Sequence, residues 1–240
     1  MKKIFLLTAA LLLASLTENI QAQWIYGALS SGINLTQVDG DEEYGYKKVG
    51  FTGGPSVIKP FGKNRNWSVT MELLFSMKGS RQRSEYIAND SVIDSVNYND
   101  GYKLDLNYVE IPLMVHFTDK KIIAAGVGFS YGQRVGYEEW VDHNKFEDPE
   151  NDPDGWHRID SSNLYRNFDF NVLADVRIRI WKRLWLNGRF SYSILPIATR
   201  FFRVPNTPTD EIWSRKQYNN IISLRLTYIF NEPLPVKKKK

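Results

Sequence analysis

The sequence has no cysteine. Disulfide bonds are therefore excluded, and burial together with backbone pairing must stabilise the fold. Long apolar runs are also missing after the first 22 residues, because the longest one covers only about residues 122–129. A membrane-spanning helix needs roughly 20 consecutive apolar residues, so a helical membrane protein is excluded. A barrel strand needs only about 10 residues with one apolar face, which this composition allows.

Net charge is also nearly absent from the body of the chain. The formal net charge is +4, but it falls to −1 once the first 22 residues and the four terminal lysines, Lys237–Lys240, are left out. Nucleic-acid-binding proteins carry a basic patch or stripe. We therefore expect no nucleic-acid partner.

Histidine is scarce, with only His116, His143 and His157 in the chain. No glycine-bounded serine, zinc-ligand spacing or phosphate-binding loop accompanies them. The sequence therefore predicts a protein that is not an enzyme, with no catalytic residues, no metal site and no cofactor.

The first 22 residues have the pattern of an export signal. Lys2 and Lys3 precede a mostly apolar core at residues 4–16, and the small residue Ala22 stands just before the expected cleavage point. The alternative is a retained helix, which is disfavoured because nothing downstream anchors it. We expect the mature chain to begin at Gln23.

Eight stretches alternate apolar and polar residues with a period of two, which is typical of strands with one apolar face. In the last of them Ile222, Leu224 and Leu226 share one face, and Ser223 and Arg225 share the other. The eight predicted strands cover residues 24–38, 47–60, 67–81, 102–118, 121–137, 166–181, 184–195 and 217–230.

The gaps between these stretches alternate between long and short. The short gaps are residues 61–66, 119–120 and 182–183, and the long gaps are residues 39–46, 83–101, 138–165 and 196–216. Outer-membrane barrels keep short turns in the periplasm and long loops outside. Together with the export signal, this pattern predicts an all-β chain that forms an eight-stranded antiparallel up-and-down transmembrane β-barrel in the bacterial outer membrane. The barrel domain would cover residues 23–230, and a basic periplasmic tail would cover residues 231–240.

Charged residues on the polar strand faces should lie inside this barrel. An eight-stranded barrel has room only for side chains in its lumen, so these charges should pair into a structural network. The alternative is an ion path. The residues assigned to the network are Glu72, Glu110, Asp175, Arg177, Arg189 and Arg225.

Three local features refine this prediction. A phase change in the fourth strand predicts a bulge near Tyr108–Val109. Small residues at the even positions of 124–132 should leave lumen space for the arginines opposite. The tryptophans that lie near the short-turn end should face the membrane interface rather than the core. These tryptophans are Trp24, Trp67, Trp181 and Trp185.

The long gap at residues 138–165 is strongly acidic. Oxygen ligands at alternate positions suit calcium, but the glutamate expected at the twelfth position of a calcium loop is replaced by Ser161. A solvated recognition loop is therefore the preferred interpretation, with calcium as the alternative. Its candidate recognition residues are Asp148, Glu150, Asp152 and Asp154.

Several segments along the chain resemble the PorT-like outer-membrane β-barrel proteins. The most distinctive segment is Leu106–Leu113, with the sequence LNYVEIPL. The other segments are residues 32–35, 50–54, 72–79, 125–128, 189–196 and 223–230. The resemblance implies an eight-stranded barrel, and the family's namesake is linked to protein export by the type IX route. One departure is that residues 231–240 follow Phe230, where such barrels usually end.

We therefore expect a non-enzymatic outer-membrane barrel that serves as an accessory factor in protein export or envelope assembly. The alternatives are a surface-exposed binding protein or adhesin that acts through its outer loops, and a small-solute channel. The expected partners are outer-membrane lipid, the barrel-insertion machinery, and either secretion-system proteins or surface ligands. The barrel itself is expected to be a monomer.

Overall fold

The computed structural model describes residues 25–41, 45–82, 85–87, 97–99, 101–142, 156–158, 163–203, 212–230 and 232. The predicted leader, and the predicted tail apart from Glu232, lie outside these described residues. Within the described ranges, no helix is long and apolar enough to cross a membrane.

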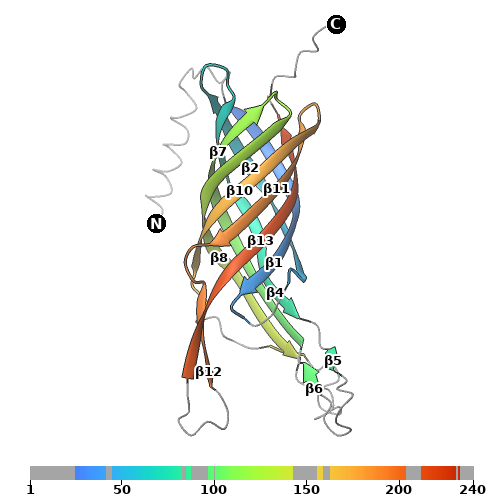
Figure 1. The fold of residues 1–240 in the computed structure, drawn as a ribbon, viewed down its shortest axis with the longest axis vertical. Coiled ribbons are helices and arrows are strands. Elements are labelled where there is room, and N and C mark those ends of the chain that lie inside the picture. The colour runs from blue at the N-terminus through green and yellow to red at the C-terminus, as the bar shows by residue number, and fades with distance from the viewer. Residues whose placement is uncertain are drawn as a thin grey trace, which may run out of the picture.

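Eight antiparallel strands close into a ring (Figure 1). The wall consists of β1 (Tyr26–Asp39), β2 (Lys48–Phe61), β3 (Trp67–Glu72) continued by β4 (Leu74–Gln82), β7 (Gly101–Asp119), β8 (Ile123–Asp142), β10 (Phe168–Trp181), β11 (Leu184–Ser193) and β13 (Ile212–Ile229). The first and last strands complete the ring, with Gly32 opposite Arg225. The fold predicted from the sequence is therefore confirmed.

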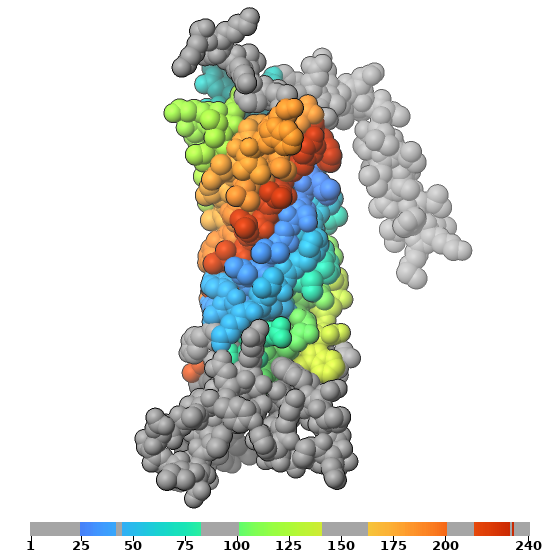
Figure 2. Space-filling view, turned by 90° about the vertical axis from the view of Figure 1, so that its right-hand side faces the viewer, coloured from blue at the N-terminus to red at the C-terminus, as the bar shows by residue number. Residues whose placement is uncertain are grey.

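The strands cross the cylinder obliquely and wrap around it, as the diagonal bands in Figure 2 show. Side chains alternate between the lumen and the outer surface along each strand. On β7 the outward residues from Val109 to Phe117 are apolar, whereas Asp105 and Lys103 follow toward the long-loop end. An apolar outer band of about this length is what a barrel strand needs to cross the hydrocarbon core.

The polar connections at the long-loop end contain strands that the sequence pattern does not reveal. They are β5 (Glu85–Ile87), β6 (Asn97–Asn99), β9 (Trp156–Arg158) and β12 (Ala198–Arg203). The loop predicted at residues 196–216 is in part a hairpin, in which β12 pairs with the start of β13 from Ala198–Gln217 to Arg203–Ile212. This hairpin projects beyond the barrel wall (Figure 1). Backbone pairing there needs no apolar stripe, so alternation cannot predict it.

A bulge is present near Tyr108 as predicted, but the prediction is wrong about the strand that carries it. The register of β7 against β8 shifts between Asn107 and Tyr108, but the extra residue is Val135 of β8. Strand β7 itself alternates without a break. The phase change in its sequence arises because the side chains of Leu104, Leu106 and Tyr108 point into the lumen and are fully buried.

Candidate functional site

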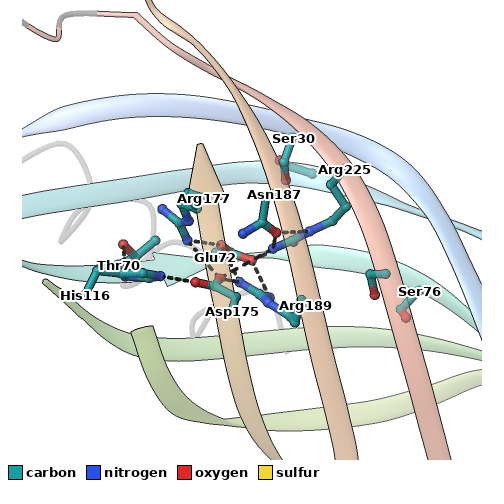
Figure 3. A network of polar contacts seen from close by, with 12 residues as sticks. Ser30, Thr70, Glu72, Ser76, His116, Asp175, Arg177, Asn187, Arg189 and Arg225 are labelled. Carbon is teal, nitrogen blue, oxygen red and sulfur yellow. Dashed lines mark hydrogen bonds and ion pairs between the residues drawn. The ribbon is translucent and has the colours of Figure 1, made fainter. Parts of the chain in front are cut away.

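A network of charged residues fills the middle of the lumen, and Glu72 of β3 lies at its centre (Figure 3). Arg189 of β11 donates to both Glu72 carboxylate oxygens at 2.9 Å. Arg225 of β13 donates to Oε2 at 3.0 Å, and Arg177 of β10 donates to Oε1 at 3.2 Å. Arg225 is further held by Asn187, whose Oδ1 accepts bonds of 2.6 and 2.9 Å. Four strands are thereby tied together across the lumen.

Asp175 is the second carboxylate of this network. It accepts hydrogen bonds from Arg189 at 3.0 Å and from Arg177 at 3.4 Å. His116 Nε2 lies 2.7 Å from Asp175 Oδ1, and His116 Nδ1 lies 3.2 Å from the hydroxyl of Thr70. Five of the six residues assigned to the lumen from the sequence therefore meet in one place.

Glu110, the sixth residue, belongs to a separate cluster nearer the long-loop end. It forms an ion pair with Lys78, which also contacts Asp169 at 2.9 Å. Ser193 and Asn219 donate to Asp169 at 2.7 and 2.8 Å. The lysine is buried, and two carboxylates and the ring of Tyr108 surround its ammonium group.

The small-residue face of β8 does lie on the lumen side, but neighbouring side chains, rather than the arginines opposite, take the space. A Cβ atom at Gly126 would lie 2.2 Å from the ring of His116. At Gly128 it would meet Met114, at 2.8 Å from its Cγ. In the register of β7 against β8, His116 lies opposite Gly126 and Met114 lies opposite Gly128. The side chains of β7 therefore lean over the glycines of β8.

An apolar cluster fills the lumen at the long-loop end, and sequence alternation does not predict it. Its buried members are Val38, Tyr102, Leu104, Leu106, Tyr108, Tyr165, Ile197 and Ala198. We call this set the apolar plug. The signal in the sequence is the inverted phase of Leu104 and Leu106, which also fits a bulge in the strand. Apolar side chains facing inward here exclude water from the lumen at this level.

The polar group that joins the apolar plug is Arg200 of β12. Its guanidinium bonds Glu139 and donates to the hydroxyls of Tyr102 and Tyr165 at 3.0 and 2.8 Å. This cluster lies beyond the apolar outer band. Burial raises the pKa of the Tyr102 phenol. Burial also disfavours the Glu139 carboxylate, but the Tyr137 hydroxyl and the Arg200 charge together hold its pKa below the ordinary value.

Little empty space remains in the lumen between the Glu72 network and the Lys78 cluster. The cavity lined by Asn34, Glu110 and Arg225 in the middle of the lumen has a volume of about 10 Å³. That is close to the minimum that holds one water molecule. Side chains, rather than an aqueous path, therefore occupy this part of the barrel.

At the short-turn end, two of the predicted interface tryptophans lie on the outer surface of the barrel and one lies in the lumen. Trp67 and Trp181 are 47% and 67% exposed on the outer surface. Trp185 is 3% exposed and packs in the lumen with Ala28, Ile58, Ala124 and Ile229. The interface prediction for Trp185 is wrong because alternation along β11 puts it on the same face as Asn187 and Arg189. Trp24 lies outside the described residues.

The four acidic recognition candidates, Asp148, Glu150, Asp152 and Asp154, lie outside the described residues. Within the part of the chain that is described, no group of three or more histidine, cysteine, aspartate or glutamate residues is arranged to hold a metal ion.

Several solved structures are similar to the chain. Ail, the attachment invasion locus protein of Yersinia pestis, is 10% identical, with 85% of this chain and 98% of that chain covered at a TM-score of 0.42. Neisserial surface protein A is 10% identical over 87% and 97% of the two chains, at a TM-score of 0.43. The outer membrane protease OmpT of Escherichia coli is 10% identical over 86% and 94%, at a TM-score of 0.39. No curated protein matches the chain significantly.

The model of the family described as the outer membrane protein beta-barrel domain matches residues 21–198. This span covers most of the ring, from β1 to the start of β12. The ring of eight strands, the apolar outer band and this match agree with one another. The chain belongs to the outer membrane protein beta-barrel domain family and is a barrel of the bacterial outer membrane.

Proposed function

We propose that this barrel is a non-enzymatic, monomeric surface-binding protein that recognises its partner through its outer end. The observation that supports this proposal is the length of the wall. β7, β8 and β13 have 19, 20 and 18 residues, whereas about 9–11 residues cross the membrane. The long-loop end faces outward by the usual topology of such barrels, so these strands continue into a raised outer platform.

The apolar plug supports this proposal because it makes the outer platform rigid. The side chains of Leu104, Leu106 and Tyr108 are fully buried inside the extended wall, and Arg200 links β12 to Glu139 of β8. Recognition sites are held best on rigid elements. A closed ring also leaves no unpaired strand edge within the wall, which favours a monomer.

The filled lumen argues against a channel. A cavity of about 10 Å³ lies between the charged layers, and the apolar plug follows it. We expect no step conductance when the purified barrel is added to a planar lipid bilayer. Discrete openings from the wild-type protein would contradict the plugged lumen.

The contacts of Thr70, His116 and Asp175 resemble those of a nucleophile, a base and an orienting acid. Thr70, however, is fully buried and is not among the residues that line the cavity next to His116. A substrate would therefore not reach its hydroxyl. This geometry supports a structural role for the three residues and a protein that is not an enzyme.

The platform can be tested by trimming the hairpin of β12 and β13. Residues 203–212 would be replaced by an Asn-Gly turn, because Phe202 and Trp213 lie opposite each other. A control variant would carry Asn-Gly in place of Lys63-Asn64 in a short connection at the opposite end. In cross-linking on intact cells, the trimmed barrel should lose its surface partner and the control should keep it. Equal capture by both variants would exclude the hairpin from recognition.

The acidic segment with Asp148, Glu150, Asp152 and Asp154 is proposed as a second part of the recognition surface. Converting the four residues to their amides should weaken capture of a cationic partner without changing barrel stability. Calcium dependence of capture, abolished in the same variant, would support the alternative calcium role instead.

A second candidate is an accessory role in protein export or envelope assembly, with secretion-system proteins as partners. The resemblance to PorT-like proteins supports it, above all through residues 106–113, which run along β7 from the apolar plug into the lipid-facing band. Deleting the gene should then reduce secreted surface proteins while other outer-membrane barrels remain at normal levels. Unchanged secretion would leave surface binding as the proposed function.

A further inference from the structure

A cavity of about 150 Å³ lies at the periplasmic mouth of the barrel, apart from the outer platform. Trp185, Tyr26 and Ile229 line it, and its polar lining includes His116 and Arg177. A cavity of this volume in another protein holds a benzene molecule. The space is therefore sufficient for a small ring compound, in contrast to the filled middle of the lumen.

Arg177 is the least well paired cation of the lumen network. Its distances to Glu72 and Asp175 are 3.2 and 3.4 Å, whereas Arg189 contacts the same two carboxylates at 2.9 to 3.0 Å. The Arg177 side chain is 7% exposed. Its Nε, like that of Arg189, is buried and has no hydrogen-bond partner within the described part of the chain, so the long contacts to the carboxylates are what set Arg177 apart. Leaving a buried charged donor incompletely paired is costly, so the Arg177 guanidinium as a whole favours an additional acceptor.

The charge balance of the network points the same way. Three guanidinium groups, those of Arg177, Arg189 and Arg225, share the two carboxylates of Glu72 and Asp175. One positive charge is thus in excess, and Arg177 is the one of these three arginines that lines the cavity. An anion entering from the periplasm would meet this excess charge.

The rim of the cavity already binds a carboxylate from the same chain. Glu232 lines the cavity, and its carboxylate accepts bonds from Arg179 at 2.5 Å and from the indole N–H of Trp185 at 3.1 Å. Arg183 also donates to the Glu232 backbone oxygen at 3.2 Å. Glu232, three residues after the end of β13, therefore lies at the barrel mouth and places a negative charge at the entrance.

We propose that the periplasmic mouth is a binding site for a small organic anion that has one acidic group on an apolar body the size of a single ring. The acidic group pairs with the guanidinium of Arg177, which lines the cavity, and the apolar body packs against Trp185 and Tyr26. Glu232 lies at the entrance, and its negative charge weakens binding of the anion by repulsion. The acidic group is a carboxylate or a phosphate, since both accept from a guanidinium.

Calorimetric titration of the full mature protein in detergent micelles tests this site with benzoate, phenyl phosphate and neutral benzamide. We expect either anion or both to bind, and to bind at least tenfold more tightly than benzamide. The anion that binds identifies the acidic group. Absence of binding by both anions, or equal binding of benzamide, would overturn the proposal.

Two variants locate the site. Arg177→Met keeps most of the side-chain length and should weaken anion binding at least tenfold. Glu232→Gln should strengthen it several-fold, because a competing negative charge is removed from the entrance. Lys63→Gln, an exposed residue that does not line the cavity, should change nothing. Should Arg177→Met fail to fold, Glu232→Gln decides alone, and unchanged affinity in that variant rejects the site.

Discussion

At the scale of single residues, each carboxylate of the central lumen network contacts several cations rather than a single partner. Glu72 contacts three arginines, and Asp175 contacts the same three arginines and a histidine. Each carboxylate satisfies cations from several strands, so the loss of one partner leaves the others incompletely paired. Removing one member of a buried charged cluster is much more costly than removing a surface charge.

Arg225→Ala should therefore destabilise the barrel by about 3 kcal/mol, because Glu72 loses a partner at 3.0 Å inside the protein. The measurement is urea unfolding in lipid vesicles, followed by tryptophan fluorescence. Lys63→Ala, at an exposed site, is the matched control and should lie within about 0.5 kcal/mol of the wild type. Equal stability of the two variants would show that the network does not stabilise the barrel.

Two glycines offer a matched test of how tightly the lumen is packed. Gly126→Ala places a methyl group 2.2 Å from His116 and should cost about 1–3 kcal/mol, because the ring must move away from Asp175. Gly188→Ala faces open space on the outer surface and should change the free energy of unfolding by less than about 0.5 kcal/mol. The same unfolding assay compares them, and a harmless Gly126→Ala would mean that His116 moves freely.

At the scale of strands, side chains keep the same period-two alternation along one strand while the outward face passes from lipid to water. The outward residues of β13 from Ile222 to Tyr228 are apolar where the strand crosses the membrane. On β8, Val127 and Phe129 belong to this apolar band, whereas Glu138 lies on the same outward face beyond it. The energetic cost of placing a charge in lipid, rather than a change in backbone geometry, separates the apolar band from the polar region beyond it.

Leu224→Arg should impair insertion by roughly 2–4 kcal/mol if the site lies near the bilayer midplane. Leu224 is 51% exposed on the outward face of β13. Glu138→Arg adds the same side chain to an outward site beyond the apolar band and should insert normally. Heat-modified migration in gel electrophoresis reports the folded fraction. Equal folding of both variants would argue against a lipid-facing band on β13.

The strand boundaries show where alternation is informative. The predicted strand at residues 184–195 corresponds to β11 at Leu184–Ser193, and the turn at residues 182–183 is as predicted. The strand predicted at residues 217–230 begins five residues earlier, at Ile212. Alternation predicts a strand well where one face meets lipid, and it fails where both faces meet water or where apolar residues point inward.

At the scale of the whole molecule, the lumen consists of layers stacked along the barrel axis. A cavity with Arg177 lies at the periplasmic mouth, the shared arginine network follows, then the Lys78 cluster, and finally the apolar plug. The three layers beyond the cavity fill the lumen with charged, then apolar, side chains. We propose separate tasks for the two ends of the barrel, with recognition at the long-loop end and anion binding at the short-turn end.

This arrangement depends on orientation, which cysteine labelling can measure because the chain has no cysteine of its own. Ser214→Cys, exposed on the outer hairpin, should react with a membrane-impermeant maleimide on intact cells. Asn64→Cys, exposed in a short connection, should react only after the outer membrane is opened. The reverse labelling pattern would show that the long-loop end faces the periplasm, which would contradict the proposed outer platform.

The sequence by itself determined the strand order, the inward and outward faces of most strands, and the set of charges available to the lumen. These features follow from a period of two in a chain whose outer face meets lipid. Only the tertiary structure decided that Glu72 is shared by three arginines, that Glu110 pairs with Lys78, and that Trp185 points inward. Contacts across a lumen depend on the tilt and stagger of strands far apart in sequence, and alternation within one strand carries no information about either.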